Sequence, residues 1–184
     1  MISLETFNLI VYIWIGIAVV LFPLQLFVTA PYGRHSKTTW GPMINNRLGW
    51  FIMEFPALFF FVFLILNGRG LPNYILLAAL ILWSIHYIHR SLIYPLRIHT
   101  KGKKMPILIM SFAMFFNLIN GTINGYWFGY LSPGYPEDWK TDWRFITGIC
   151  LFIIGFLINQ YHDRLLIRLR KSSINGYKIC SFKK

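Results

Sequence analysis

The sequence predicts an all-α integral membrane protein, a multi-spanning helix bundle of about five transmembrane helices. The first observation is composition: 56% of the 184 residues are hydrophobic and only 13% are charged, with a mean hydropathy of +0.53. A soluble domain carries roughly a quarter charged residues, and one small core has no room for this much apolar surface. The second observation is a set of five long apolar runs, and the third is the placement of basic residues between them.

The five apolar runs define the predicted spans. A transmembrane helix needs ~20 mostly apolar residues, a length that three runs meet and that the second and third fall somewhat short of. The predicted spans are 8–28, 50–66, 71–88, 105–130 and 145–162. We expect them to form a single membrane domain over residues 1–184, in which 163–184 is a basic cytoplasmic tail.

The segments between the runs predict where the helices end. Pro31 and Gly33 in "TAPYGRH" break the helix that follows the first run, and the tight turn "LNGRGLPN" predicts that spans two and three pair in antiparallel fashion. The fourth run ends in "NGTINGYWFGYLSPGYPEDW", whose Gly, Asn, Pro and aromatic residues predict an irregular, partly interfacial segment. There is no internal repeat, which disfavours a transporter built from inverted halves.

The basic residues are concentrated on alternate loops. Fifteen of the eighteen Lys and Arg residues lie in the first and third loops or after the fifth run. This positive-inside bias predicts that the N-terminus faces away from the cytoplasm and that the C-terminus is cytoplasmic. The membrane would be the endoplasmic reticulum in a eukaryote and the inner membrane in a bacterium. The same bias explains the net charge of +12 without a nucleic-acid partner.

Glu54 is the first residue expected to carry chemistry. A carboxylate inside an apolar run is costly, by ~2.5–3.5 kcal/mol on insertion scales for Asp, and such residues are usually functional. The alternative is a structural carboxyl that is hydrogen-bonded to a neighbouring helix. As a functional group, Glu54 could act as a hydrogen-bond donor to an oxygen.

A polar stripe follows the third run. Tyr87, Arg90, Tyr94 and Arg97 are spaced by three, four and three residues, which places them on one helix face, and two histidines flank them. The alternative is that the aromatic residues anchor the interface while the arginines reach towards water. The predicted antiparallel turn brings Glu54 to the depth of Tyr87, where a carboxyl and a phenol could polarise a carbonyl. The arginines would suit phosphates.

A second polar group lies at the end of the fifth run. Asn159 and Asp163 are four residues apart, and Arg170 follows seven residues later on the same face. These side chains could bind amides, sugar hydroxyls and a phosphate. The alternative is an ordinary solvated helix end. Cys150 and Cys180 are expected at different depths, and the sequence has no disulfide or metal pattern.

Together these segments resemble the steroid 5α-reductase family. The motifs that carry the resemblance are "PYGRH", "GWFIMEFPA", "HYIHRSLIYPLR", "NGYWFGY", "YPEDWKTDWRF" and "GFLINQYHDRLLIRLRKSSINGYKI", in the family's order, from about residue 29 to residue 179. The resemblance implies an integral membrane enzyme of seven helices, whose partners are membrane lipid and an apolar 3-oxo-Δ4 steroid or related enone lipid. It would transfer a hydride from NADPH to the β-carbon of the substrate, and a proton would then reach the α-carbon.

The resemblance also implies roles for individual residues. Glu54 and Tyr87 match the catalytic pair that holds the C3 carbonyl of the substrate and stabilises the enolate. Lys103 stands where the family can carry arginine, so it keeps the charge but loses the two-pronged contact. The positions that match the lining of the NADPH pocket or substrate channel are Tyr32, Trp50, Arg90, Tyr94, Lys103, Asn159, Asp163 and Arg170.

The sequence departs from the family pattern after "GYKI". The family continues with a proline, a glycine pair, an Asn-containing turn, a Glu-Trp helix and a seventh span, whereas here "CSFKK" follows. We therefore expect a C-terminally truncated member that lacks two spans. The alternative to a reductase is a non-catalytic membrane isoform, or a lipid-binding or assembly partner of the full-length enzyme. Steroids, sterol intermediates, polyprenol-like lipids and very-long-chain enoyl lipids all remain open as substrates.

Overall fold

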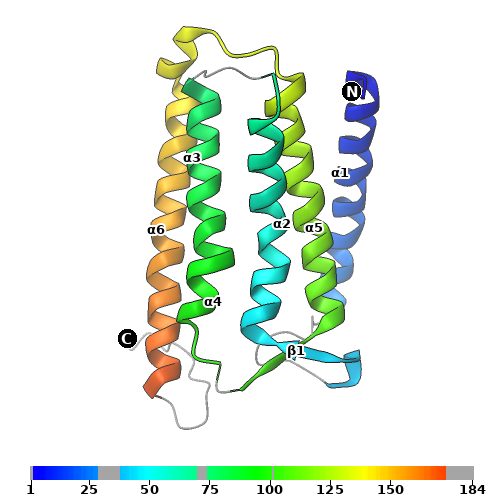
Figure 1. Ribbon diagram of the computed structural model, residues 1–184, viewed down its shortest axis with the longest axis vertical. Helices are drawn as coiled ribbons and strands as arrows, with labels where there is room; N and C mark the ends of the chain where they lie inside the picture. Colours follow the sequence, from blue (N-terminus) through cyan, green and yellow to red (C-terminus); the bar gives the residue numbers. More distant parts are fainter. Residues whose placement is uncertain (1, 29–37, 70–73, 101, 173–184) are drawn as a thin grey trace.

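The chain is a bundle of membrane-spanning helices, as the sequence predicts (Figure 1). The computed structural model describes residues 2–28, 38–69, 74–100 and 102–172, without the side chains of residues 38 and 170–172. Within these residues five helices are long and apolar enough to cross a membrane: Leu4–Phe27, Asn46–Leu66, Tyr74–Arg97, Ile107–Leu131 and Trp143–Leu169. Successive spans alternate in direction, so the start of the first and the end of the fifth lie at opposite ends of the bundle (Figure 1).

The first helix, α1 (Leu4–Phe27), lies at the edge of the bundle (Figure 1). Ser3 caps it, because its Oγ accepts a backbone N–H of the first turn at 3.1 Å. Phe7 is the one buried side chain of α1, and its ring stacks on those of Tyr126 and Trp127. Trp14 packs against Phe115 and Phe116 of α5, and most of the other apolar side chains are exposed, which suits a helix that faces lipid on most sides.

A short sheet joins the starts of the second and fourth spans. Asn45 caps the second span, because its Oδ1 accepts the Arg47 backbone N–H at 2.9 Å. The two strands pair antiparallel, with Met43 opposite Pro106. The sheet therefore holds both helix starts at one end of the molecule. The elements here are η2 (Thr38–Trp40), β1 (Met43–Asn45), α2 (Asn46–Leu66) and β2 (Lys104–Pro106).

The third span contains one π-helical turn. Pro95 has no backbone N–H, so the carbonyl four residues earlier cannot receive the usual helical bond. The Tyr94 N–H instead reaches the carbonyl of His89, five residues back, and the Ser91 hydroxyl donates to the Tyr87 carbonyl at 2.6 Å. The span is thus built from α3 (Tyr74–Ile88), η3 (His89–Ile93) and α4 (Tyr94–Arg97).

The fourth span packs against α2 through glycines spaced four residues apart. A Cβ atom at Gly121 would lie 2.9 Å from the Cα of Ala57, and one at Gly125 would lie 2.9 Å from the Cα of Phe61. Small residues at this spacing let two membrane helices approach closely. The remaining elements of the described residues are α5 (Ile107–Tyr126), η4 (Trp127–Leu131), η5 (Glu137–Thr141) and α6 (Trp143–Ser172).

The helices extend beyond several predicted boundaries. The span expected over 71–88 continues to Arg97, because the π-turn absorbs Pro95 without ending the helix. The prediction of an irregular segment from "NGTING" onward is wrong for the residues up to Leu131. These residues are helical, and their glycines lie in the contact with α2. Irregular backbone begins only after that residue. The first ten residues of the predicted tail 163–184 continue α6 to Ser172.

Candidate functional site

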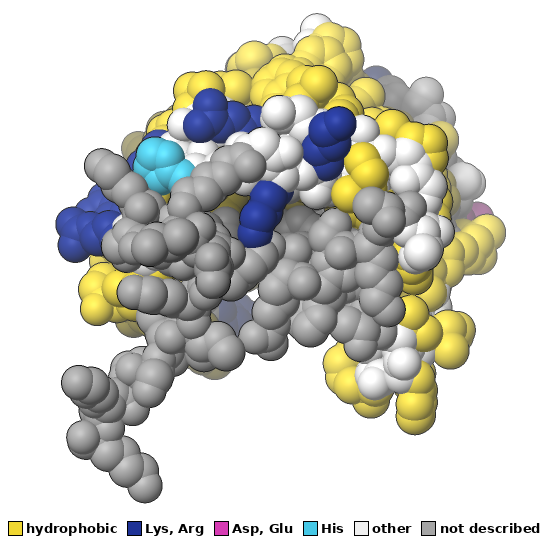
Figure 2. Space-filling view, turned by 90° about the horizontal axis from the view of Figure 1, so that it is seen from below, with side chains coloured by type: hydrophobic (Ala, Val, Ile, Leu, Met, Phe, Trp, Pro, Cys, Tyr) yellow, Lys and Arg dark blue, Asp and Glu magenta, His cyan; other side chains and the backbone are white. Residues whose placement is uncertain are grey.

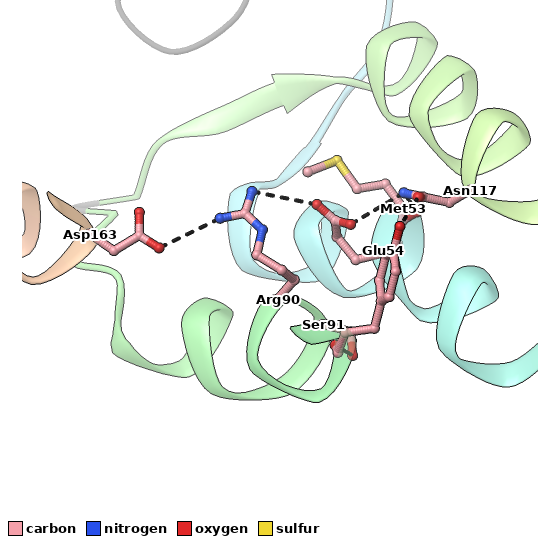
Figure 3. A network of polar contacts seen from close by, with 7 residues as sticks. Met53, Glu54, Arg90, Ser91, Asn117 and Asp163 are labelled. Atoms are coloured by element: carbon pink, nitrogen blue, oxygen red, sulfur yellow. Dashed lines mark hydrogen bonds and ion pairs between the residues drawn. The ribbon is translucent and has the colours of Figure 1, made fainter. Parts of the chain in front are cut away.

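Glu54 lies on α2 and is held by side chains from two other helices (Figure 3). Its Oε1 is 3.6 Å from Nη2 of Arg90, and its Oε2 accepts a hydrogen bond from Nδ2 of Asn117 at 3.3 Å. Only 13% of the Glu54 side chain is exposed. A carboxylate at this depth is therefore paired on both oxygens, as a buried acidic group must be.

Arg90 connects the second and third spans to the fifth. Its guanidinium lies 4.5 Å from the ring centre of Trp50 and 5.0 Å from that of Tyr94, so it is packed against two aromatic faces. Its second charged contact is Asp163 of α6, where Nη1 and Oδ2 are 3.6 Å apart. Figure 3 shows Arg90 between the two carboxylates. The arginine thus sits at the meeting point of three helices, with its π-turn backbone directing it there.

Asn117 of α5 joins Glu54 to Tyr87. Its amide donates to the carbonyl of Met53 at 2.7 Å as well as to Glu54, and its Oδ1 accepts from the Tyr87 hydroxyl at 3.5 Å. Asn120, one turn further along α5, donates to the Tyr87 hydroxyl at 3.2 Å. The carboxyl and the phenol therefore belong to one polar cluster, with the asparagine between them.

An apolar cavity of about 380 Å³ opens beside this cluster. Trp83 forms part of its wall: the ring stacks on Phe61 with centres 4.3 Å apart, and its indole N–H donates to the Ala57 carbonyl at 2.9 Å. Tyr87 belongs both to the wall and to the polar cluster. The cavity thus presents mainly carbon surface with a phenol at its edge. Its lining residues are Phe61, Ala79, Leu82, Trp83, His86, Tyr87, Phe128 and Phe152.

The two histidines of the third span face α6. The His86 ring packs edge-on against Phe152 and Phe156, and the His89 ring packs edge-on against Phe156. His89 is 6% exposed, and neither ring nitrogen has a hydrogen-bond partner among the described residues. Within the described ranges no group of His, Cys, Asp or Glu side chains could hold a metal ion.

Most of the residues singled out in the sequence are brought together. Lys103 and Asn159 are exposed. Tyr32 lies outside the described residues, as does the side chain of Arg170. The predicted residues that the cluster gathers are Trp50, Glu54, Tyr87, Arg90, Tyr94 and Asp163.

Sequence reasoning missed the asparagines of α5. Asn117, Asn120 and Asn124 recur at intervals of three and four residues in an otherwise apolar helix, which puts them on one face. That periodicity was a usable signal, because amides inside a membrane helix need partners on neighbouring helices. The residues of the expected stripe also differ in burial, because Tyr94 is buried whereas Arg97 is exposed.

The fold and the cluster define a class: a multi-pass membrane protein with a polar site beside an apolar intramembrane cavity. A family model described as 3-oxo-5-alpha-steroid 4-dehydrogenase matches residues 103–183. The steroid 5-alpha-reductase DET2 of Arabidopsis thaliana is 40% identical over 158 residues, covering 83% of this chain and 60% of that protein. The 3-oxo-5-alpha-steroid 4-dehydrogenase 1 of Homo sapiens is 36% identical over 153 residues, covering 80% and 57%.

This chain covers a larger share of a third relative. The steroid 5-alpha-reductase DET2 of Solanum lycopersicum is 33% identical over 177 residues, covering 94% of this chain and 68% of that protein. The chain belongs to the steroid 5-alpha-reductase family. It spans about 60% of the length of the relatives from Arabidopsis thaliana and Homo sapiens.

Proposed function

We infer that this chain forms the carbonyl-binding site of an NADPH-dependent reductase acting on the Δ4 double bond of a 3-oxo-steroid or a related enone lipid. The observation that carries this proposal is the cluster of Glu54, Asn117 and Tyr87, whose tyrosine also lines an apolar cavity. The relatives are named for the same reaction class, as steroid 5-alpha-reductases and 3-oxo-5-alpha-steroid 4-dehydrogenases.

The cavity suits a flat, apolar ligand. Its volume of about 380 Å³ lies within the roughly 300–1,000 Å³ of small-molecule sites, which are mostly apolar with a few placed polar groups. A ring system could lie against Trp83 and Phe61, with its oxygen towards the Tyr87 hydroxyl. Such a ligand dissolves in lipid, so it would reach the cavity from within the membrane.

The Tyr87 hydroxyl would act on the carbonyl oxygen. When a hydride adds to the β-carbon of an enone, negative charge develops on that oxygen, and a positioned donor stabilises the enolate. A protonated Glu54 would supply a second hydrogen bond to the same oxygen once one of its two oxygens leaves Arg90 or Asn117. The hydrogen on the α-carbon arrives separately as a proton, which completes the reduction.

The residues at the basic end fit a phosphate-bearing cofactor. Arg90 already contacts two carboxylates and two aromatic rings, and guanidinium groups bind phosphates through paired hydrogen bonds. Figure 2 shows Lys and Arg side chains across the end of the bundle where α2 begins and α6 ends. NADPH bound there would supply the hydride. The described residues that would hold it are Trp50, Arg90, Tyr94, Lys103, Asn159 and Asp163.

The same basic end indicates the orientation in the membrane. From the positive-inside bias we expect this end, with the end of α6, to face the cytoplasm, where NADPH is available. The membrane would be the endoplasmic reticulum in a eukaryote. Anchored this way, the protein would take the steroid from lipid and the cofactor from water.

The test is reduction of progesterone by NADPH in nanodiscs that contain the chain. Glu54→Gln and Tyr87→Phe should each lower kcat/KM by about 100-fold or more, the usual cost of losing one donor to a developing oxyanion. Tyr161→Phe, on the exposed face of α6, is the control and should retain full activity. Progesterone binding that depends on Glu54 and Tyr87 without turnover would instead favour the lipid-binding or assembly partner. Turnover that survives both substitutions would contradict the proposal.

A further inference from the structure

Three asparagines on α5 form a chain of hydrogen bonds that ends on Tyr87. We call Asn117, Asn120 and Asn124 the asparagine ladder. The Asn124 amide donates to the backbone carbonyl of Asn120 at 2.9 Å and to its side-chain Oδ1 at 3.1 Å. All three residues are buried or half-buried, in a span where water cannot replace a missing partner.

The ladder determines which way the Asn120 amide points. Its Oδ1 accepts from Asn124, so the Nδ2 is the atom left to face Tyr87, at 3.2 Å from the phenol oxygen. If the Asn120 amide were flipped, its N–H groups would face the N–H groups of Asn124. The phenol oxygen of Tyr87 is therefore held as an acceptor towards α5.

Asn117 is oriented from the other side. Its two amide hydrogens have two acceptors, the Met53 carbonyl and the Glu54 carboxylate, so its Oδ1 must be the atom that faces Tyr87. The contact from the Tyr87 hydroxyl to that Oδ1 is 3.5 Å long, at the outer limit of a hydrogen bond. The phenol proton is thus held weakly, while the phenol oxygen is held more closely by Asn120.

We propose that the asparagine ladder is a positioning device that makes the Tyr87 hydroxyl a donor to a ligand carbonyl and a poor acceptor for a ligand hydroxyl. This proposal rests on the proposed function and adds a source of specificity to it. A carbonyl oxygen, which can only accept, takes the weakly held proton. The proton of a ligand hydroxyl instead finds the phenol oxygen already bonded to Asn120. Donation from Asn120 also polarises the phenol O–H bond, which strengthens its bond to the ligand.

The first experiment needs no ligand. A fluorinated tyrosine is introduced at position 87, and its fluorine NMR signal in nanodiscs reports the hydrogen bonds of the phenol oxygen. Asn120→Leu should shift the signal, and Asn124→Leu should shift it in the same direction, although Asn124 does not contact Tyr87. The control is Thr122→Val, a polar residue of the same helix outside the ladder, which should leave the signal in place. An unchanged signal in both asparagine variants would overturn the proposal, regardless of whether the protein binds or reduces steroids.

The second experiment measures selectivity. Affinities for progesterone and its 3β-hydroxy-Δ4 analogue are compared by equilibrium dialysis on the same nanodiscs. The unmodified chain should prefer the ketone, and Asn120→Leu should reduce this preference about five- to tenfold, the range for losing one buried hydrogen bond. An unchanged preference in Asn120→Leu would overturn the proposal while the proposed function stands. A chain that binds neither steroid would contradict the proposed function, and a shifted fluorine signal would then still support the ladder.

Discussion

Two helix pairs in this bundle are held together in different ways. α2 and α5 touch backbone to backbone through Gly121 and Gly125, and they share the most extensive contact in the described residues. The third span and α6, called here the α3–α6 pair, meet through side chains: histidine rings of α3 and η3 against Phe152 and Phe156, and the ion pair of Arg90 in η3 with Asp163. The glycines Gly148 and Gly155 of α6 have no atoms within 4 Å of where a Cβ would lie.

The difference assigns distinct roles to the two pairs. The α2–α5 pair carries Glu54 and the asparagine ladder, whose short polar contacts tolerate little movement. The α3–α6 pair carries the contacts proposed for the cofactor, which depend on one long arginine side chain. A close-packed wall therefore carries Glu54 and the asparagine ladder, and a wall that side chains can adjust carries Tyr87, most of the cavity lining and Arg90.

The largest expected effect comes from separating the close-packed pair. A leucine at Gly125 would drive its side chain into the backbone of α2, where even a Cβ would lie 2.9 Å from the Cα of Phe61. Overpacking of this kind costs about 3 kcal/mol of unfolding free energy or more when the backbone must move. Thermal unfolding in detergent micelles should show a clearly lowered Tm for Gly125→Leu.

Gly155→Leu is the matched control for this substitution. It adds the same side chain to α6 at a site with open space around it, so its Tm should equal that of the unmodified chain. Equal melting of the Gly125 and Gly155 variants would contradict the distinction between the two helix pairs.

The second expected effect comes from cutting the side-chain link. Arg90→Met keeps an unbranched apolar stem but removes the guanidinium, which leaves Glu54 and Asp163 without their shared cation. Both pairs are partly exposed at 3.6 Å, so we expect a loss of about 2 kcal/mol, below the value for a fully buried pair. Arg90→Lys should recover only part of this, since an ammonium cannot reach both carboxylates in the same way.

The measurement that separates the pairs is a spin-label distance. Labels at Ile81 and Ile154, after replacement of the native cysteines, report the α3–α6 separation, and both sites are exposed. In Arg90→Met this distance distribution should broaden, whereas labels at Phe59 and Phe112 on α2 and α5 should report no change. Arg168→Met makes the same charge change at an exposed position of α6 and serves as the control. A broadened α2–α5 distance in Arg90→Met would contradict the proposed independence of the two pairs.

Much of the fold was predictable because lipid imposes simple rules on sequence. The apolar runs predicted all five spans, and the orientation derived from the basic loops stays a prediction. Glu54 was identifiable for the same reason, since a carboxylate in such a run requires partners. Helical spacing and the predicted antiparallel turn brought Arg90 and Tyr94 near it, and the family resemblance added Trp50 and Asp163 to the same site.

The features that could not be predicted depend on how one helix meets another. The segment around Gly121 and Gly125 was interpreted as irregular, because glycine disfavours an isolated helix and only a close neighbour reverses that preference. The π-turn at Pro95 changes the phase of the third span, so the regular spacing of Tyr87, Arg90 and Arg97 overstated their shared face. Helical periodicity in the sequence reveals neither the close glycine contact nor the π-turn.

The smallest expected effect concerns the start of α6, which is stabilised locally by a cap. The carboxylate of Asp142 accepts hydrogen bonds from the side chain and the backbone N–H of Arg144, and these bonds lower the pKa of Asp142 from 3.8 to about 2. A lowered pKa in the folded state means that the cap contributes fully above about pH 4 and is lost as the pH falls towards 2. Asp142→Ala should therefore slightly lower the Tm at pH 7, measured by circular dichroism, and the difference from the unmodified chain should vanish near pH 2. Asp138→Ala removes a neighbouring carboxylate of η5 outside the cap and should leave the Tm unchanged at both pH values. If instead Asp142→Ala lowered the Tm as much as Gly125→Leu, the start of α6 would be as tightly integrated as the α2–α5 pair, and the contrast between a close-packed and an adjustable wall would fail at that end of the bundle.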